Sequence, residues 1–166
     1  MKINVGCGKK ILDGYINVDV VKRPGVDYVC PASSLPFSDG VAREVLAIHV
    51  VEHVYSWEVP ALLAEWARVL RPGGNLILEM PDILLAARNL AEGLKLGKHP
   101  DQAHMWAIYG DDTMRDPWMM HKSGWYFDRL RPLVEQAGFD SVVRKDTVFH
   151  PVGRGVRDFR LEAVRK

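Results

Sequence analysis

The sequence predicts a single α/β domain, built on a mostly parallel, seven-stranded sheet whose C-terminal strand is antiparallel. Three observations support this fold class. Short apolar runs alternate with helical patterns in the first half of the chain, which is typical of a parallel sheet. A glycine pair directly follows the first apolar run. Two β-type runs, separated by Pro151, Gly153 and Gly155, end the chain and indicate an antiparallel pair.

The first strand, residues 2–5, leads into a turn at Gly6 and Gly8 and then into a second strand, residues 15–18. Two glycines let the backbone turn sharply and approach a ligand without interference from a Cβ atom. Only six residues separate Gly8 from Tyr15, too few for a full crossover helix. The first crossover is therefore predicted to be shortened.

The other predicted elements follow in chain order. Apolar runs bounded by turn residues predict five more strands, at residues 26–30, 43–48, 75–80, 141–148 and 157–164. Apolar residues at helical spacing predict three helices, at residues 56–70, 83 to about 96, and 128–137. Asp128 is expected to cap the last helix and Gly138 to end it. Residues 97–124 show no regular pattern.

Composition limits the classes of protein and partner. The chain has 166 residues, of which 48% are hydrophobic and 26% charged, and this fits one domain over residues 1–166. Lys and Arg total 22 against 21 for Asp and Glu, so no strong field favours nucleic acid or an anionic membrane. No oligomeric state follows from these numbers.

Two further features concern location and the cysteines. The first strand begins almost at Met1, and no run of 18 apolar residues is present, so we expect neither a signal peptide nor a membrane span. The expected location is cytoplasmic. Cys7 and Cys30 are too few for a disulfide framework and are expected to be small buried thiols.

Asp19 ends the second strand, beside the glycine turn. A carboxylate at the tip of a neighbouring parallel strand can accept hydrogen bonds from a ribose diol, which suggests a nucleoside ligand. A dinucleotide site needs a third glycine where Ile11 stands, and an acid about 20 residues further along the chain. Asp19 comes too early, so the pattern favours a smaller nucleoside ligand over NAD.

Taken together, the segments resemble the class I S-adenosylmethionine-dependent methyltransferases, in particular the small bacterial type 11 proteins. Six segments carry the resemblance, at residues 4–8, 14–19, 35–39, 48–54, 68–74 and 137–139. It implies a Rossmann-like fold, S-adenosyl-L-methionine as cofactor, and transfer of a methyl group to oxygen or nitrogen of a small-molecule or glycan-type acceptor. An alternative is a catalytically silent protein of the same fold that binds the cofactor or serves as a partner subunit.

The resemblance also implies a set of cofactor-binding residues: Val5, Gly6, Cys7, Gly8, Asp19, Val20, Ser33, Ser34, Leu35, His49 and Val50. One departure concerns the adenine. Many relatives have an acid where Pro31 stands, and that acid accepts a hydrogen bond from the adenine amino group. Ser33, Ser34 or a backbone carbonyl would have to replace it here.

Methyl transfer requires mainly that the reacting groups are aligned and water is excluded, and a nearby base helps if the acceptor is a hydroxyl or amine. The candidates are His49, Tyr109 and His121. For His49 the alternative is that only its backbone faces the cofactor. Residues 97–124 are expected to form a lid and an acceptor pocket, or else a small core of their own.

Histidines also raise the question of a metal. The arrangement His49-x-x-Glu52-His53 is similar to the Glu-x-x-Glu-His metal motif of some methyltransferases that act on RNA ends and quinones, but the first acid is a histidine here. Two histidines at i and i+4 can share a metal on one helical face. No third ligand is identifiable, so no metal site is predicted, and His53 is expected to be a packed or capping residue. His99, Asp101 and His104 are expected to lie in a solvated loop.

Overall fold

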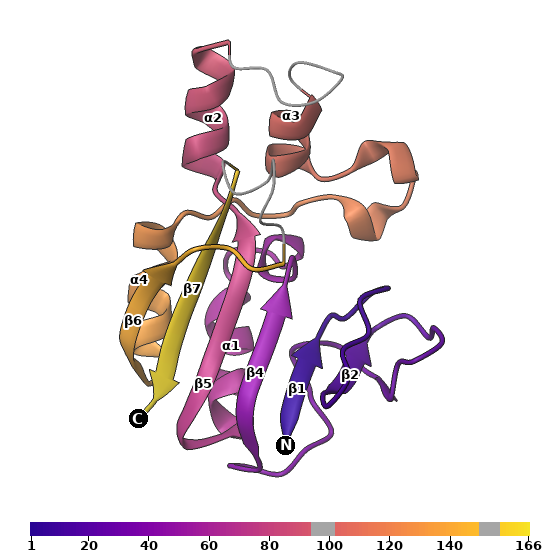
Figure 1. Cartoon of the computed structure of the whole chain (residues 1–166), viewed down its shortest axis with the longest axis vertical. Coiled ribbons are helices and arrows are strands. Elements are labelled where there is room, and N and C mark those ends of the chain that lie inside the picture. Colours follow the sequence, from indigo (N-terminus) through magenta and orange to yellow (C-terminus); the bar gives the residue numbers. More distant parts are fainter. Residues whose placement is uncertain (94–101, 150–156) are drawn as a thin grey trace.

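In the computed structural model the chain folds around one sheet, with strand order β3-β2-β1-β4-β5-β7-β6 (Figure 1). The structure describes residues 1–93, 102–149 and 157–166. The strands are β1 (Lys2–Val5), β2 (Ile16–Asp19), β3 (Tyr28–Val29), β4 (Ala42–Ile48), β5 (Leu70–Pro81), β6 (Phe139–Lys145) and β7 (Asp158–Arg165). Pairings among β1 to β5 are parallel, and β7 is antiparallel to both β5 and β6. The predicted fold class is confirmed.

The described residues form four α-helices and three short 3-10 helices: η1 (Val51–His53), α1 (Val59–Val69), α2 (Ile83–Ala91), α3 (Gln102–Tyr109), η2 (Asp112–Met114), η3 (Pro117–Met119) and α4 (Phe127–Gln136). Helices α1 and α4 contact each other on one face of the sheet, whereas α2 and α3 lie beyond the carboxyl end of β5 (Figure 1). None of the described helices has the length and apolar character needed to cross a membrane.

Strand alternation divides the sheet into an apolar face and a polar face. Residues of the core cluster, such as Val45, Leu78 and Leu161, alternate with Glu44, Glu79 and Arg160. Successive side chains of a strand point to opposite faces, so the first set packs under α1 and α4 around the fully buried Trp66. The polar set forms its own ion pairs, including Arg160 Nη1 to Glu79 Oε1 at 2.9 Å.

Two buried asparagines hold the shortened first crossover. The Asn4 side chain donates to Lys10 O and to Asn17 Oδ1, each at 2.9 Å, and Asn17 Oδ1 also accepts from Leu12 N at 3.0 Å. The connection from β1 to β2 contains no helix, as predicted. Side-chain amides therefore satisfy backbone groups that a crossover helix would otherwise have satisfied.

Several predicted boundaries are wrong. Strand β5 begins at Leu70, directly after α1, and not at Asn75; the extra Pro-Gly-Gly residues enter the strand where its register with β4 shifts between Ala42 and Glu44. Strand β3 has two residues instead of five. Helix α2 ends at Ala91, and the predicted continuation toward residue 96 lies partly outside the described residues.

The last helix and the middle segment also differ from expectation. Tyr126, not Asp128, is the N-cap of α4. Asp128 lies in the first turn, where a negative charge interacts favourably with the positive end of the helix dipole. Gly138, with a φ of 94°, ends the helix as predicted. Residues 97–124 are not irregular throughout, because α3 lies within them. Both cysteines are free; Cys7 is buried as predicted, whereas Cys30 is only partly buried.

Candidate functional site

Two clefts meet at the carboxyl edge of the sheet, between β1 and β4. The connections from these neighbouring strands lead to opposite sides, and ligands of open α/β sheets bind at this kind of switch point. The first cleft has a volume of about 630 Å³ and the second about 350 Å³. Both are lined by Gly6, His49 and His53. A ligand that spans the two clefts must pass these residues.

Gly6 and Gly8 are both in the left-handed region, with φ of 63° and 55°, but they are needed for different reasons. A Cβ atom on Gly6 would lie 2.5 Å from Val50 Cγ2, a steric overlap. A Cβ atom on Gly8 would meet no atom of the described residues within 4 Å. Gly6 therefore permits close packing within the protein, whereas Gly8 leaves open space at the wall of the second cleft.

Asp19 closes the glycine turn from the end of β2. Its side chain is nearly buried, and its Oδ2 accepts from Gly8 N at 2.7 Å. Its Oδ1 accepts from Val21 N at 2.8 Å and from Arg23 Nη1 at 3.3 Å. A carboxylate offers about four acceptor positions, so one remains for a further donor in the first cleft.

The other predicted cofactor residues divide into two groups. Those that line a cleft, besides Gly6, Gly8 and Asp19, are Cys7, Val20, Ser33, His49 and Val50. Val5, Ser34 and Leu35 line neither cleft. Val5 and Leu35 belong to the hydrophobic core, because the strand and the loop turn these side chains away from the cleft edge.

His49 joins the two clefts and is held between two carboxylates. Its Nδ1 lies 2.9 Å from Glu52 Oε1, and its Nε2 lies 3.3 Å from Asp158 Oδ2. Burial by itself lowers the pKa of the imidazole, but hydrogen bonds to Asp158 and Glu52 outweigh burial and raise that pKa to about 9. An imidazolium that donates from both nitrogens bonds one carboxylate on each side, and in this arrangement it cannot accept a proton.

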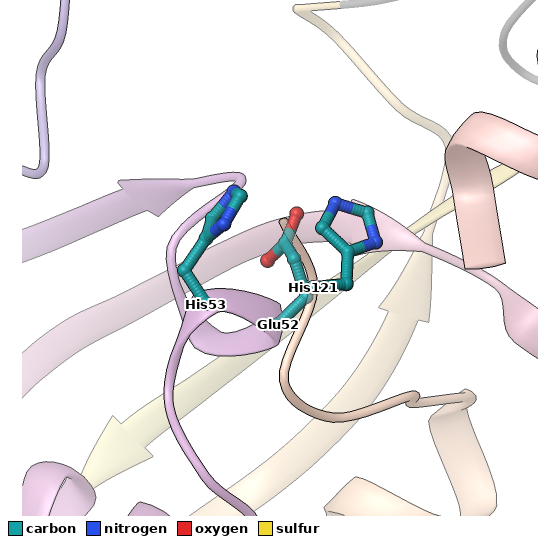
Figure 2. Close-up of side chains that lie close together, drawn as sticks. All are labelled: Glu52, His53 and His121. Carbon is teal, nitrogen blue, oxygen red and sulfur yellow. The ribbon is translucent and has the colours of Figure 1, made fainter. Parts of the chain in front are cut away.

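Glu52, His53 and His121 form a cluster beside His49 (Figure 2). One potential ligand atom from each of the three side chains lies within 4.8 Å of the other two. His121 is distant from the other two residues along the chain. Backbone hydrogen bonds hold it beside them, because Lys122 N and Ser123 N both donate to Glu52 O, at 2.8 and 3.1 Å. Burial lowers the pKa of the His121 imidazole, which favours its neutral form.

Tyr109 does not join this cluster. Its side chain is 57% exposed and lines neither cleft, although its carbonyl accepts from His121 N at 3.0 Å. His99 and Asp101 lie outside the described residues. His104 is fully buried, so the expectation that it lies in a solvated loop is wrong.

The middle segment supplies walls to both clefts. Trp106, Asp111, Met119 and His121 line the second cleft, whereas Trp118 and Lys122 line the first.

Sequence reasoning missed Asp158 as a site residue, since it begins a strand far along the chain and no local pattern marks it. Glu52 lies within the recognised motif, but only the structure shows that its carboxylate faces two histidines.

Residues 13–78 match the family model for the methyltransferase domain. No curated protein sequence matches the chain. Among solved structures, an S-adenosylmethionine-dependent methyltransferase from Thermotoga maritima is 18% identical with a TM-score of 0.60, covering 90% of this chain and 72% of that one. A 1,6-didemethyltoxoflavin-N1-methyltransferase from Burkholderia thailandensis, solved with 1,6-didemethyltoxoflavin and S-adenosylhomocysteine, is 15% identical with a TM-score of 0.63, covering 99% and 70%.

An Archaeoglobus fulgidus S-adenosylmethionine-dependent methyltransferase is 18% identical with a TM-score of 0.57, covering 91% of this chain and 76% of that one. At such identities these likenesses establish the fold. The sequence match runs from the approach to β2 into β5, including Asp19 and His49, and covers less than half of the chain. The match over residues 13–78 and the shared fold together support a class I S-adenosylmethionine-dependent methyltransferase, with S-adenosyl-L-methionine as its cofactor.

Proposed function

We propose that this enzyme methylates an oxygen or nitrogen atom of a small-molecule or glycan-type acceptor. The observation that carries the proposal is the meeting of two clefts at Gly6, His49 and His53. The second cleft, at about 350 Å³, falls within the range of pockets that hold small molecules. The first is large enough for the nucleoside part of the cofactor. The methionyl part would reach the glycine turn in the second cleft, and the rest of that cleft is left for the acceptor.

The cofactor residues proposed for the first cleft are Asp19, Val20, Ser33 and Val50. S-adenosylmethionine supplies an activated methyl group on a sulfonium when it is bound. The remaining acceptor position on the Asp19 carboxylate fits a ribose hydroxyl. Ser33 would contact the adenine region in place of the acid that many relatives have where Pro31 stands.

The glycine turn would hold the methionyl part of the cofactor. Gly6, Cys7 and Gly8 line the second cleft, and the open space in front of Gly8 fits a ligand that approaches the backbone closely. His49, as a partly buried cation, would fix the shape of the junction between the clefts through its bonds to Glu52 and Asp158.

On the acceptor side, Trp106 and Met119 offer an apolar wall and His121 offers a polar group. This combination suits a flat acceptor that carries a hydroxyl or an amine. His121 is the best-placed group to promote loss of the acceptor proton, directly or through an ion that it binds, because its ring is neutral and His49 is engaged on both sides. The toxoflavin methyltransferase, which shares the fold and was solved with a flat heterocycle bound, supports this acceptor class.

We also propose that residues 97–124 act as a lid within the single domain. The described part of this segment already contributes residues to both clefts, including Trp106 and Trp118. Closing the segment over the cofactor would exclude water from the junction, which methyl transfer requires.

The test combines calorimetric titration with a turnover screen. The protein is titrated with S-adenosylmethionine and S-adenosylhomocysteine, and release of S-adenosylhomocysteine is then followed with flat phenols, aromatic amines and sugar precursors. We expect saturable cofactor binding and turnover with at least one small acceptor. Tight cofactor binding without turnover on any class would favour the catalytically silent alternative.

A further inference from the structure

We propose that Glu52, His53 and His121 form a binding site for a divalent transition-metal ion. The three side chains come together from η1 and from the segment that follows η3, and they face one another (Figure 2). The site lies where the two clefts meet, since His53 lines both clefts and His121 lines the second.

The Glu52 carboxylate is half satisfied within the protein. It is 2% exposed, and its Oε1 bonds His49 Nδ1 at 2.9 Å. Its Oε2 is buried and has no hydrogen-bond partner among the residues that the structure describes. A buried anionic oxygen without a partner is unfavourable, and native proteins generally provide one. A cation beside the two histidines would supply that partner.

The two histidines are held in the tautomer that a metal requires. His53 Nδ1 lies 3.2 Å from Met120 O, and His121 Nδ1 lies 3.1 Å from Ala107 O. A carbonyl can only accept a hydrogen bond, so a neutral form of either ring has its proton on Nδ1 and its lone pair on Nε2. Metal-binding histidines commonly have this arrangement, with one nitrogen bound to a backbone carbonyl and the other to the metal.

The donor set indicates the class of ion. Two imidazoles and one carboxylate are typical of catalytic zinc sites and of other first-row transition metals, whereas Mg²⁺ and Ca²⁺ prefer oxygen ligands alone. In a tetrahedral site with bonds of about 2.0–2.1 Å, the ligand atoms are about 3.4 Å apart. The three atoms lie within 4.8 Å of one another, so the side chains must move together slightly when the ion binds.

Three protein ligands leave an open coordination position beside the second cleft. If the proposed function holds, an acceptor hydroxyl bound there would release its proton to water more readily, because a divalent ion lowers the pKa of an oxygen that it coordinates. This consequence for the acceptor rests on the proposed function, whereas the presence of the site does not.

The test uses Co²⁺ and Zn²⁺ as probes on the whole chain after treatment with a chelator. Visible absorption of Co²⁺ reports imidazole coordination, and calorimetry with Zn²⁺ gives the stoichiometry and affinity. We expect one ion per chain, with affinity reduced at least about ten-fold in His53→Ala and in His121→Ala. Asp111→Asn is the matched control, because Asp111 lines the same cleft outside the cluster, and its affinity should stay within about two-fold.

Circular dichroism checks that each variant is folded, and His121→Gln replaces His121→Ala if the alanine variant is not. Failure of the wild-type protein to bind either ion at millimolar concentration would overturn the proposal, as would undiminished binding in folded His53 and His121 variants. Titration of the metal-free protein with S-adenosylhomocysteine separates the two proposals. Cofactor binding with no metal binding would reject the metal site and leave the methyltransferase function standing.

Discussion

The contact between Gly6 and Val50 provides a quantitative test of why the glycine turn has its sequence. In Gly6→Ala the new Cβ would lie 2.5 Å from Val50 Cγ2, at a residue whose φ is 63°. A non-glycine residue in the left-handed region costs about 1–2 kcal/mol. Overpacking of a buried contact adds about 1–3 kcal/mol. The free energy of unfolding should therefore fall by about 2–5 kcal/mol.

A double-mutant cycle with Val50→Ala separates the two contributions. Removing the Val50 methyl groups abolishes the overlap but leaves the backbone strain, so Gly6→Ala should cost only about 1–2 kcal/mol in that background. The coupling energy is then about 1–3 kcal/mol, measured by urea unfolding of all four proteins. Gly8→Ala is the matched control, because Gly8 has a similar φ of 55° and no atom in the described ranges lies within 4 Å of its added Cβ.

Two results would refute this reasoning. Gly6→Ala could cost the same with and without the Val50 methyl groups, which would mean that the overlap is relieved by a small backbone shift. Gly8→Ala could destabilise the protein as much as Gly6→Ala, which would mean that strain alone explains both glycines. We expect instead that Gly8→Ala has the smaller effect on unfolding and a clear effect on cofactor affinity, because it fills space in the second cleft.

Further predictions concern the cofactor, the thiol, the lid and the acceptor. Asp19→Ala should weaken S-adenosylmethionine binding at least several-fold by calorimetry, since a charge-assisted hydrogen bond contributes about 1.5–3 kcal/mol; an unchanged dissociation constant in folded protein would remove the ribose assignment. Burial and the Asp19 charge raise the pKa of Cys7 to about 11, so its alkylation by iodoacetamide should be very slow at pH 7 and rise about ten-fold per pH unit up to pH 10; a fast pH-independent reaction would contradict this. Amide exchange in residues 102–124 should slow when S-adenosylhomocysteine binds, with α1 unchanged as the internal control, and equal exchange with and without ligand would reject the lid. His121→Ala should lower turnover more than cofactor affinity, and a parallel loss of both would place His121 in the cofactor site instead.

Interactions between residues close together in the sequence explain which features could be predicted from it. Strands and helices follow from the period of apolar residues, and the glycine turn and the shortened crossover follow from backbone sterics and chain length. These features depend on neighbours in sequence, so Gly6, Gly8 and Asp19 could be placed at the sheet edge before the structure was known. Boundaries were less accurate where tertiary contacts decide them, as at Leu70, where pairing with β4 extends β5 back to the end of α1.

Tertiary structure alone decided the chemistry around His49. Asp158 reaches His49 because β7 runs antiparallel to β5, so its first residue lies at the same edge where the parallel strands end. His121 reaches Glu52 because the backbone of residues 122 and 123 bonds to Glu52 O. Neither contact leaves a periodic pattern in the sequence, since each joins residues that are distant along the chain. The charge of His49 and the grouping of Glu52, His53 and His121 therefore depend on the order of the strands and on how the middle segment docks, which no short stretch of sequence encodes.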